Sequence, residues 1–169
     1  LNGTVSTSNV ALNLNSTLLV TGNSQLSAGS GQITLGAATT LGSGNALTLG
    51  TGGSGGVSAT SISGTAGGLA EDLTINVTGT VGVTGAVADI STLTVTQSGG
   101  TTFSSTVNAA TVTLTDTTGA IAFQGNVTAT TLNTAVQTYS AVFQGSSNTI
   151  TNAVTFSNTG GVTLGNGGD

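Results

Sequence analysis

The chain has 169 residues, with no Lys, Arg, His, Cys, Met, Pro or Trp, and its five acidic residues give a net charge of −5 at pH 7. Without cationic side chains it can form neither side-chain salt bridges nor a basic surface that neutralises phosphates, which excludes nucleic acid as an expected partner. Without Cys it can form neither disulfides nor thiolate metal sites.

The composition predicts an all-β fold. The apolar fraction of 36% consists mainly of Val, Leu, Ile and Ala, diluted by Thr, Ser, Asn and 28 Gly residues. β-branched residues and Gly disfavour helices and suit short strands joined by tight turns. No apolar run approaches the roughly 18 residues that span a bilayer. No stretch combines a basic n-region with an apolar h-region, so we expect a processed chain or a fragment.

In the first third of the chain, apolar residues recur at intervals of 21. Such a period indicates that equivalent segments stack on one another. The predicted stacking pairs are Leu12 with Ile33, Leu14 with Leu35, Val20 with Leu41 and then Ile62, Leu26 with Leu47, and Ala28 with Leu49.

Two segments interrupt this register. The stretch "GTGGSGG" at 50–56 has too little side chain to fill an inward-facing strand, and "GTAGGLAED" at 64–72 holds the only adjacent acidic pair, Glu71 and Asp72. We predict irregular loops near 50–57 and 64–72, the second with a short helical turn.

From residue 73 onward the interval is 19 or 20, as when "AIAFQGN" at 120–126 returns as "SAVFQGS" at 140–146. Apolar and polar residues alternate within each unit, which is typical of half-buried strands. The predicted core columns are Val83, Phe103, Phe123 and Phe143; Val87, Val107 and Val127; Leu73, Leu93, Val112 and Leu132; and Ile75, Val95 and Leu114.

Strands this short cannot each bury their apolar face, but stacked equivalent strands can. The sequence therefore predicts a right-handed parallel β-helix, a β-solenoid with about 20–21 residues per coil and roughly eight coils. It forms one solenoid over residues 1–169, either as a whole protein or as a fragment of a longer repeat protein. Phe103, Phe123 and Phe143 are predicted to form an inward aromatic ladder, with Gly125 and Gly145 at the corners that follow.

The acidic residues do not indicate a catalytic site. Glu71, Asp72, Asp89, Asp116 and Asp169 are scattered, whereas glycan-cleaving enzymes need clustered carboxylates, usually with a base or electrophile. The motif "GNGGD" at 165–169 is similar to the start of a calcium-binding nonapeptide, but it occurs once, and we interpret it as a Gly-rich turn. We predict no enzymatic activity, no cofactor and no metal site.

Thr pairs occur at Thr94/Thr96, Thr113/Thr115 and Thr149/Thr151, a pattern similar to the Thr arrays of ice-binding solenoids. The equivalent positions Asn133 and Ala135 interrupt the array, so ordinary solvent-facing Thr is the favoured interpretation. Tyr139 is the only aromatic residue predicted to be exposed for stacking against a sugar.

The repeat columns and the run "LTVTQSGGTTFSSTVNAATVTLTDTTGAIAFQGNV" at 93–127 resemble the repetitive cell-surface β-helix proteins of Gram-negative bacteria, such as filamentous-haemagglutinin-like adhesins and autotransporter passenger domains. The resemblance lies in repeat character and composition, and it transfers no site residues. It implies secretion, display at the cell surface and an adhesive or structural function.

Three functions are compatible with these features. The first is a non-catalytic extracellular structural or adhesive protein; the alternative is a self-polymerising subunit of a fibre, sheath or surface layer; the third is a glycan- or ice-binding solenoid. Natural sheets guard their edges with Lys, Pro, bulges or caps, and Lys and Pro are absent here. We therefore expect the ends to be covered by end-to-end stacking of the chain on itself or by further repeats, with host or surface glycans as additional partners.

Overall fold

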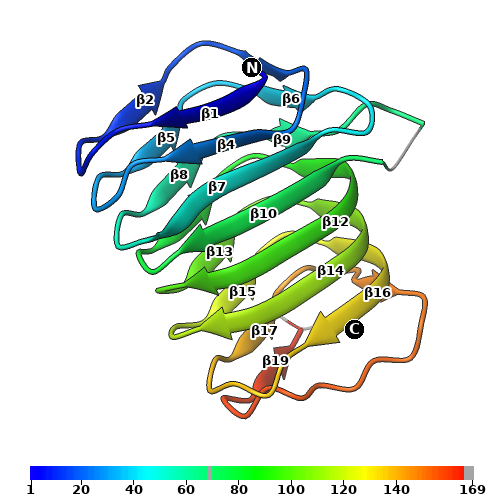
Figure 1. Ribbon diagram of the computed structural model, residues 1–169. Coiled ribbons are helices and arrows are strands. Elements are labelled where there is room, and N and C mark those ends of the chain that lie inside the picture. Colours follow the sequence, from blue (N-terminus) through cyan, green and yellow to red (C-terminus); the bar gives the residue numbers. More distant parts are fainter. Residues whose placement is uncertain (68–69, 166–169) are drawn as a thin grey trace.

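The protein is a right-handed parallel β-helix of eight coils, seen in a computed structural model that describes residues 1–67 and 70–165 (Figure 1). Every strand pairing recorded among these residues is parallel and joins one coil to the next. The predicted fold class is therefore confirmed. Each coil contributes one segment to each of three walls of the solenoid, called here the back, front and side walls.

The back wall is a sheet with one three-residue strand from each coil. In most of these strands the first and third residues point inward and are buried, while the middle residue points outward. In order along the stack the strands are β2 (Leu12–Leu14), β5 (Ile33–Leu35), β8 (Val57–Ala59), β11 (Val81–Val83), β13 (Thr101–Phe103), β15 (Ile121–Phe123), β17 (Ala141–Phe143) and β19 (Val162–Leu164).

The front and side walls belong to one eleven-stranded sheet, because three long strands bend around the corner between them (Figure 1). The long strands are β12 (Val87–Ser98), β14 (Val107–Thr117) and β16 (Val127–Thr134). The front wall begins with β1 (Gly3–Ser6), β4 (Ser24–Ser27), β7 (Ala46–Gly53) and β10 (Asp72–Val77). The side wall holds β3 (Leu18–Val20), β6 (Thr39–Leu41), β9 (Ile62–Ser63), the starts of the long strands, and β18 (Thr149–Ile150).

The predicted aromatic ladder lies inside the coil. Val83 pairs with Phe103, which pairs with Phe123, which pairs with Phe143, and all four side chains are buried. Successive Phe rings stack with centroids 5.1 and 5.0 Å apart and interplanar angles of 8° and 13°. A twenty-residue spacing thus places one ring above the next at about the strand separation of a sheet.

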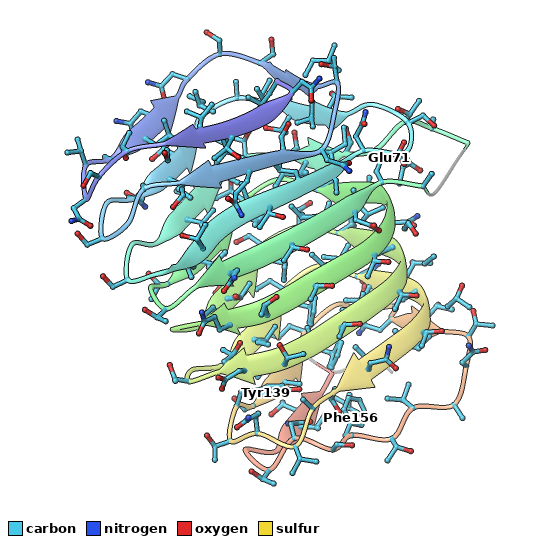
Figure 2. All side chains as sticks on the ribbon, in the orientation of Figure 1. Glu71, Tyr139 and Phe156 are labelled. Carbon is cyan, nitrogen blue, oxygen red and sulfur yellow. The ribbon has the colours of Figure 1, made fainter. Side chains whose placement is uncertain are left out.

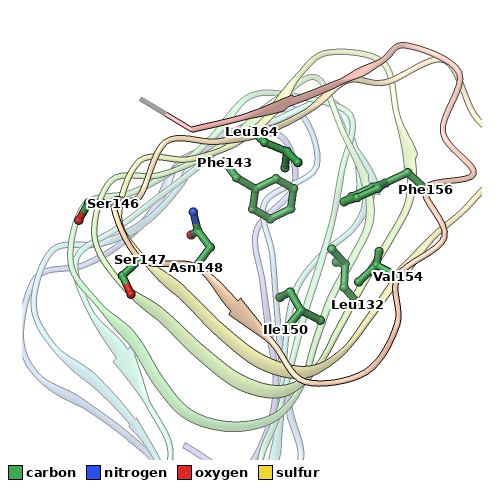
Figure 3. A pocket seen from close by; sticks show the side chains of 9 residues that line it. All are labelled: Leu132, Phe143, Ser146, Ser147, Asn148, Ile150, Val154, Phe156 and Leu164. Atoms are coloured by element: carbon green, nitrogen blue, oxygen red, sulfur yellow. The ribbon is translucent and has the colours of Figure 1, made fainter. Parts of the chain in front are cut away.

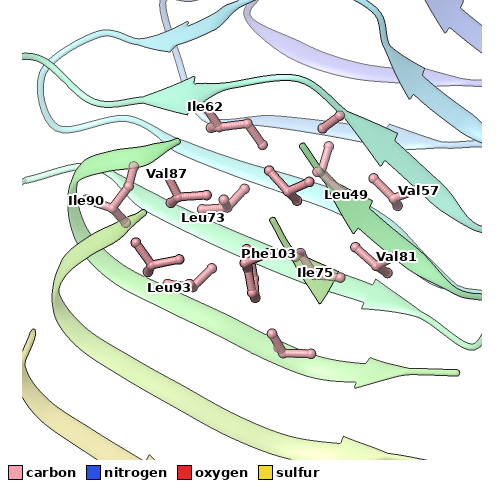
Figure 4. Packing of buried hydrophobic residues seen from close by; sticks show 14 of the residues in the cluster. Leu49, Val57, Ile62, Leu73, Ile75, Val81, Val87, Ile90, Leu93 and Phe103 are labelled. Atoms are coloured by element: carbon pink, nitrogen blue, oxygen red, sulfur yellow. The ribbon is translucent and has the colours of Figure 1, made fainter. Parts of the chain in front are cut away.

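The other three predicted columns from residue 73 onward are also present. Their members occupy equivalent positions in successive coils, are buried, and form one core with the aromatic ladder (Figure 4). The columns are Leu73–Leu93–Val112–Leu132, Ile75–Val95–Leu114 and Val87–Val107–Val127.

A bulge explains why some intervals are 19 and others 20. Val87 pairs with Val107, but Ile90 pairs with Ala109, so β12 holds one extra residue at the corner. Asp89 lies within the bulge with φ of 55°, a left-handed conformation that Asp tolerates better than most residues.

Two predicted pairings near the N-terminus are wrong. Leu26 pairs with Leu49 instead of Leu47, and Leu47 lies opposite Ser24; Ala28 is consequently not the partner of Leu49. Between paired positions the chain has five residues from Leu41 to Leu47 but only three from Val20 to Ser24. The turn after β6 closes through a hydrogen bond from the Asn45 N–H to the Gly42 carbonyl (3.1 Å), and the two extra residues shift the pairing of β4 with β7 by two.

The predicted pairing of Leu41 with Ile62 is wrong for a related reason. Val20 pairs with Leu41 as predicted, but Ile62 pairs with Thr39 above it and with Val87 below it. Compared with the preceding coil, the turns before β8 contain extra residues, and the corner between β8 and β9 contains one residue fewer. These changes in length place Ile62 in the column of Val87.

The glycine-rich segment 50–56 is a tight corner of the coil, and the prediction of an irregular loop is wrong for most of it. Residues 50–53 complete β7, and β8 starts at Val57. A Cβ atom on Gly55 would lie 1.7 Å from the carbonyl oxygen of Gly31 in the coil above. Only glycine allows so close an approach of successive corners.

The segment 64–72 does leave the sheet. No described residue between Ser63 and Asp72 belongs to a strand, and β10 starts at Asp72. None of the described residues is helical, and the short helical turn predicted here falls partly on residues 68–69, which lie outside the described residues.

Replacing Phe123 by Ala tests the aromatic ladder. Phe123 is fully buried between two rings, so truncation removes both stacking contacts and leaves a cavity. The free energy of unfolding, measured by denaturant titration, should fall by about 3–5 kcal/mol. Thr102→Ala, at an outward position of the same wall, is the control and should change it by less than about 0.5 kcal/mol. Equal effects of the two substitutions would contradict the inward ladder.

Candidate functional site: the polar walls and the open ends

The described carboxylates lie in the middle of the stack and do not converge. Asp72 starts β10, where its Oδ1 accepts a hydrogen bond from the Thr92 N–H (3.1 Å). Asp89 occupies the bulge at the corner of β12, and Asp116 lies on the front wall opposite Gln97. In residues 1–67 and 70–165, no three His, Cys, Asp or Glu side chains gather closely enough to hold a metal ion. Asp169 and most of the "GNGGD" motif lie outside the described residues.

Glu71 is fully buried, although the sequence suggests a surface loop (Figure 2). Its Oε2 accepts a hydrogen bond from the Ala70 N–H (3.1 Å), and Oε1 has no hydrogen-bond partner among the described residues. The absence of a side chain at Gly64 leaves room for this carboxyl group, because a Cβ there would lie 2.8 Å from Oε2. The Glu71 carboxyl group therefore lies in the interior of the protein, next to Gly64 and Ala70.

Tyr139 is buried, so the prediction of an exposed aromatic platform is wrong. Its side chain is 1% exposed. The hydroxyl group donates to the Leu114 carbonyl (3.0 Å) and accepts from the Ala135 N–H (3.1 Å). Tyr139 thus fastens the turn after β16 to the coil above, and it offers no surface for stacking on a sugar.

Thr residues form two neighbouring outward columns on the front wall. One column runs through Thr48, Thr74, Thr94 and Thr113 and ends at Asn133; the other runs through Thr92, Thr111 and Thr131 below Asp72. The hydroxyl group of Thr115, in the next outward position of β14, bonds to the Val95 carbonyl (3.1 Å). The hydroxyl groups of Thr113 and Thr131 accept hydrogen bonds from the Nδ2 atoms of Asn133 (3.5 Å) and Asn152 (3.0 Å). The Thr array is therefore two columns wide and three to four coils long, and part of it is hydrogen-bonded within the wall.

An apolar hollow of about 470 Å³ opens at the C-terminal end of the coil (Figure 3). It forms because the segment after β18 leaves the sheet: Phe156 stacks edge-on against Phe143 (centroids 6.2 Å apart) instead of continuing the wall above it. Sequence periodicity gives no signal for this hollow. Its lining residues are Leu132, Phe143, Ser146, Ser147, Asn148, Ile150, Val154, Phe156 and Leu164.

The N-terminal end is open as well. Strands β1, β2 and β3 each have a partner on one side only, namely β4, β5 and β6. The inward side chains of this first coil are only partly covered at Val5, Leu14 and Leu18. Three of the four exposed large hydrophobic residues lie in the end coils: Val10 (64% exposed), Leu19 (55%) and Leu164 (64%).

Comparison of the chain with family models, curated proteins and solved structures finds no match. Among the described residues, no helix has the length and apolar character of a membrane-spanning segment.

The buried Tyr139 hydroxyl group should make stability fall at high pH. Burial is the main cause that raises the pKa of Tyr139, opposed by its hydrogen bond with the Ala135 N–H. Above pH ~10 the tyrosine of the unfolded chain ionises while that of the folded chain keeps its proton, so the unfolded state gains stability. The free energy of unfolding should therefore decrease between about pH 10 and the raised pKa.

The chain suits this experiment, because without Cys, Lys and Arg Tyr139 is the only side chain that titrates between about pH 9 and 12. The control is Tyr139→Phe, which should be less stable at neutral pH by about 0.5–1.5 kcal/mol, since the hydrogen bond from the Tyr139 hydroxyl to the Leu114 carbonyl is lost while the Ala135 N–H keeps its bond to that carbonyl (2.9 Å). Denaturant titrations of this variant should show no comparable decrease above pH ~10. A similar decrease in both proteins would contradict the role given to Tyr139.

Proposed function

We propose that this chain is a non-catalytic extracellular protein with a structural or adhesive function. The observation that carries the proposal is the division between a continuous apolar core and polar walls. The core runs through all eight coils, while outward wall positions are occupied mainly by Thr, Ser, Asn and Gln. A solenoid of this kind is a rigid rod that displays a long, uniform polar surface.

The distribution of titratable groups supports a function without catalysis. The described residues hold no cluster of three acidic side chains, and both Glu71 and the only Tyr are buried. Acid–base or nucleophilic catalysis needs such groups within hydrogen-bond reach of one substrate.

The extracellular location is proposed from the resemblance to bacterial surface β-helix proteins. A repetitive solenoid with polar walls fits adhesion, since its hydroxyl and amide groups can hydrogen-bond to host or surface glycans along the rod. The resemblance also supports a secreted, bacterial protein displayed at the cell surface.

A self-polymerising subunit of a fibre, sheath or surface layer is the second candidate. The specific observation in its favour is that both ends of the coil are open and apolar. A third candidate, a glycan- or ice-binding solenoid, is supported only by the two Thr columns of the front wall, and the buried position of Tyr139 counts against it.

Immunogold labelling of intact cells that produce the protein tests the location. We expect gold particles on the outside of unpermeabilised cells, and none for a cytoplasmic marker labelled in parallel. Labelling that appears only after permeabilisation would contradict the extracellular assignment.

A further inference from the structure

The two ends of the coil are the two sides of one interface. Each coil is covered above and below by its neighbours through in-register parallel pairing, and this pairing repeats at every step of the back wall from β2 to β19. The last coil presents the lower side of that interface and the first coil presents its upper side. A second copy of the chain can therefore meet the same kind of surface that each inner coil already meets.

The back-wall strands at the two ends match residue by residue. Strand β19 has the sequence Val-Thr-Leu, and β2 has Leu-Asn-Leu. Within the chain, β2 already pairs with β5, whose sequence Ile-Thr-Leu is almost that of β19. Stacking β19 on β2 of a second copy would continue both inward columns and keep the polar residues Thr163 and Asn13 outside.

The last strand of the side wall, β18, lies one coil before the last strand of the back wall, β19. Leu18 begins the column that passes through Thr39, Ile62, Val87, Val107 and Val127, and the Val127 N–H donates to the Asn148 Oδ1 (3.0 Å). Ile150 pairs with Ala129, two positions along from Val127, as Val20 lies two positions along from Leu18. Because β18 follows β17 and β3 follows β2, pairing β2 of a second copy with β19 leaves one side-wall position between β18 and β3 of that copy, in line with these two columns.

The hollow supplies space for the incoming side chains. It lies inside the last coil, between Phe143 and Leu164 of the back wall and Ile150, Val154 and Phe156 (Figure 3). The partly covered Val5, Leu14 and Leu18 of a second copy occupy the interior of its first coil and would face this opening. Their burial is the favourable term that drives the contact, because apolar area removed from water stabilises an interface.

No described side chain brings a charge to the contact. The described acidic residues Glu71, Asp72, Asp89 and Asp116 lie in the middle coils, and the described parts of the first and last coils contain no acidic or basic side chain. The edge strands also lack the Lys and Pro residues with which natural proteins prevent such pairing.

We propose that the open ends bind each other in a head-to-tail seam, in which β19 of one copy pairs in parallel with β2 of the next, with Val162 opposite Leu12, Thr163 opposite Asn13 and Leu164 opposite Leu14. The seam rests on the second candidate function, self-polymerisation. Because the two surfaces lie at opposite ends of the rod, repeated contacts produce an open linear filament instead of a closed dimer.

Disulfide trapping tests this register, since the chain has no Cys of its own. The variant Asn13→Cys/Thr163→Cys carries its two thiols at opposite ends of one molecule, so only different molecules can join. Neighbouring strands lie about 4.8 Å apart, within the separation that a disulfide spans. Under mild oxidation we expect a ladder of dimers, trimers and longer species in non-reducing electrophoresis. The control, Ser58→Cys/Thr163→Cys, places one thiol on β8 in the middle of the same outward column and should remain unlinked.

Sedimentation of a second pair of variants separates the seam from self-assembly in general. Leu164→Lys adds a charge at an exposed end position and should shift the chain toward monomers, whereas Thr102→Lys adds the same charge to the wall of a middle coil and should leave assembly unchanged.

Assemblies without the disulfide ladder, or a ladder in the Ser58 control, would overturn the seam while leaving self-polymerisation in place. If the unmodified chain stays monomeric, something other than a second copy, such as further coils, must cover its ends. That result would overturn both the seam and self-polymerisation. The extracellular structural function does not depend on either result.

Discussion

In-register parallel pairing between successive coils is the interaction on which the rest of the structure depends. Backbone hydrogen bonds hold each coil one strand spacing from the next, so residues at equal positions lie in line. Because apolar and polar residues alternate along each strand, stacking the strands in register produces apolar columns inside the coil and polar columns outside it. The stacked Phe rings, the glycine corners and the polar walls all follow from this pairing.

The sequence predicts the inner columns well where coil length is constant. Along the inner columns from Leu73 to Phe143 the interval is 19 or 20, and the bulge at Asp89 changes it by only one. Prediction fails where turns change length, because periodicity cannot tell which corner takes the extra residues. Leu47 and Ile62 were therefore assigned to the wrong columns. Glycine-rich corners were read as loops because their close approach appears only in three dimensions.

The candidate site was less predictable than the fold. Composition indicates that the ends lack the usual guards, but the hollow depends on Phe156 leaving the sheet and turning edge-on to Phe143, which no periodic pattern encodes. Burial of Tyr139 and Glu71 was also missed, since a polar or aromatic residue between strands is usually exposed. The result is a rod with polar walls, whose described end coils leave apolar side chains partly uncovered, and the proposed seam would cover them.

Electron cryo-microscopy of the purified 169-residue chain tests this central claim most directly. The account predicts filaments one solenoid wide, in which the spacing of about 4.8 Å between back-wall strands continues across each junction between molecules. Isolated rods of eight coils with ordered ends, or sheets joined through the polar walls, would contradict it.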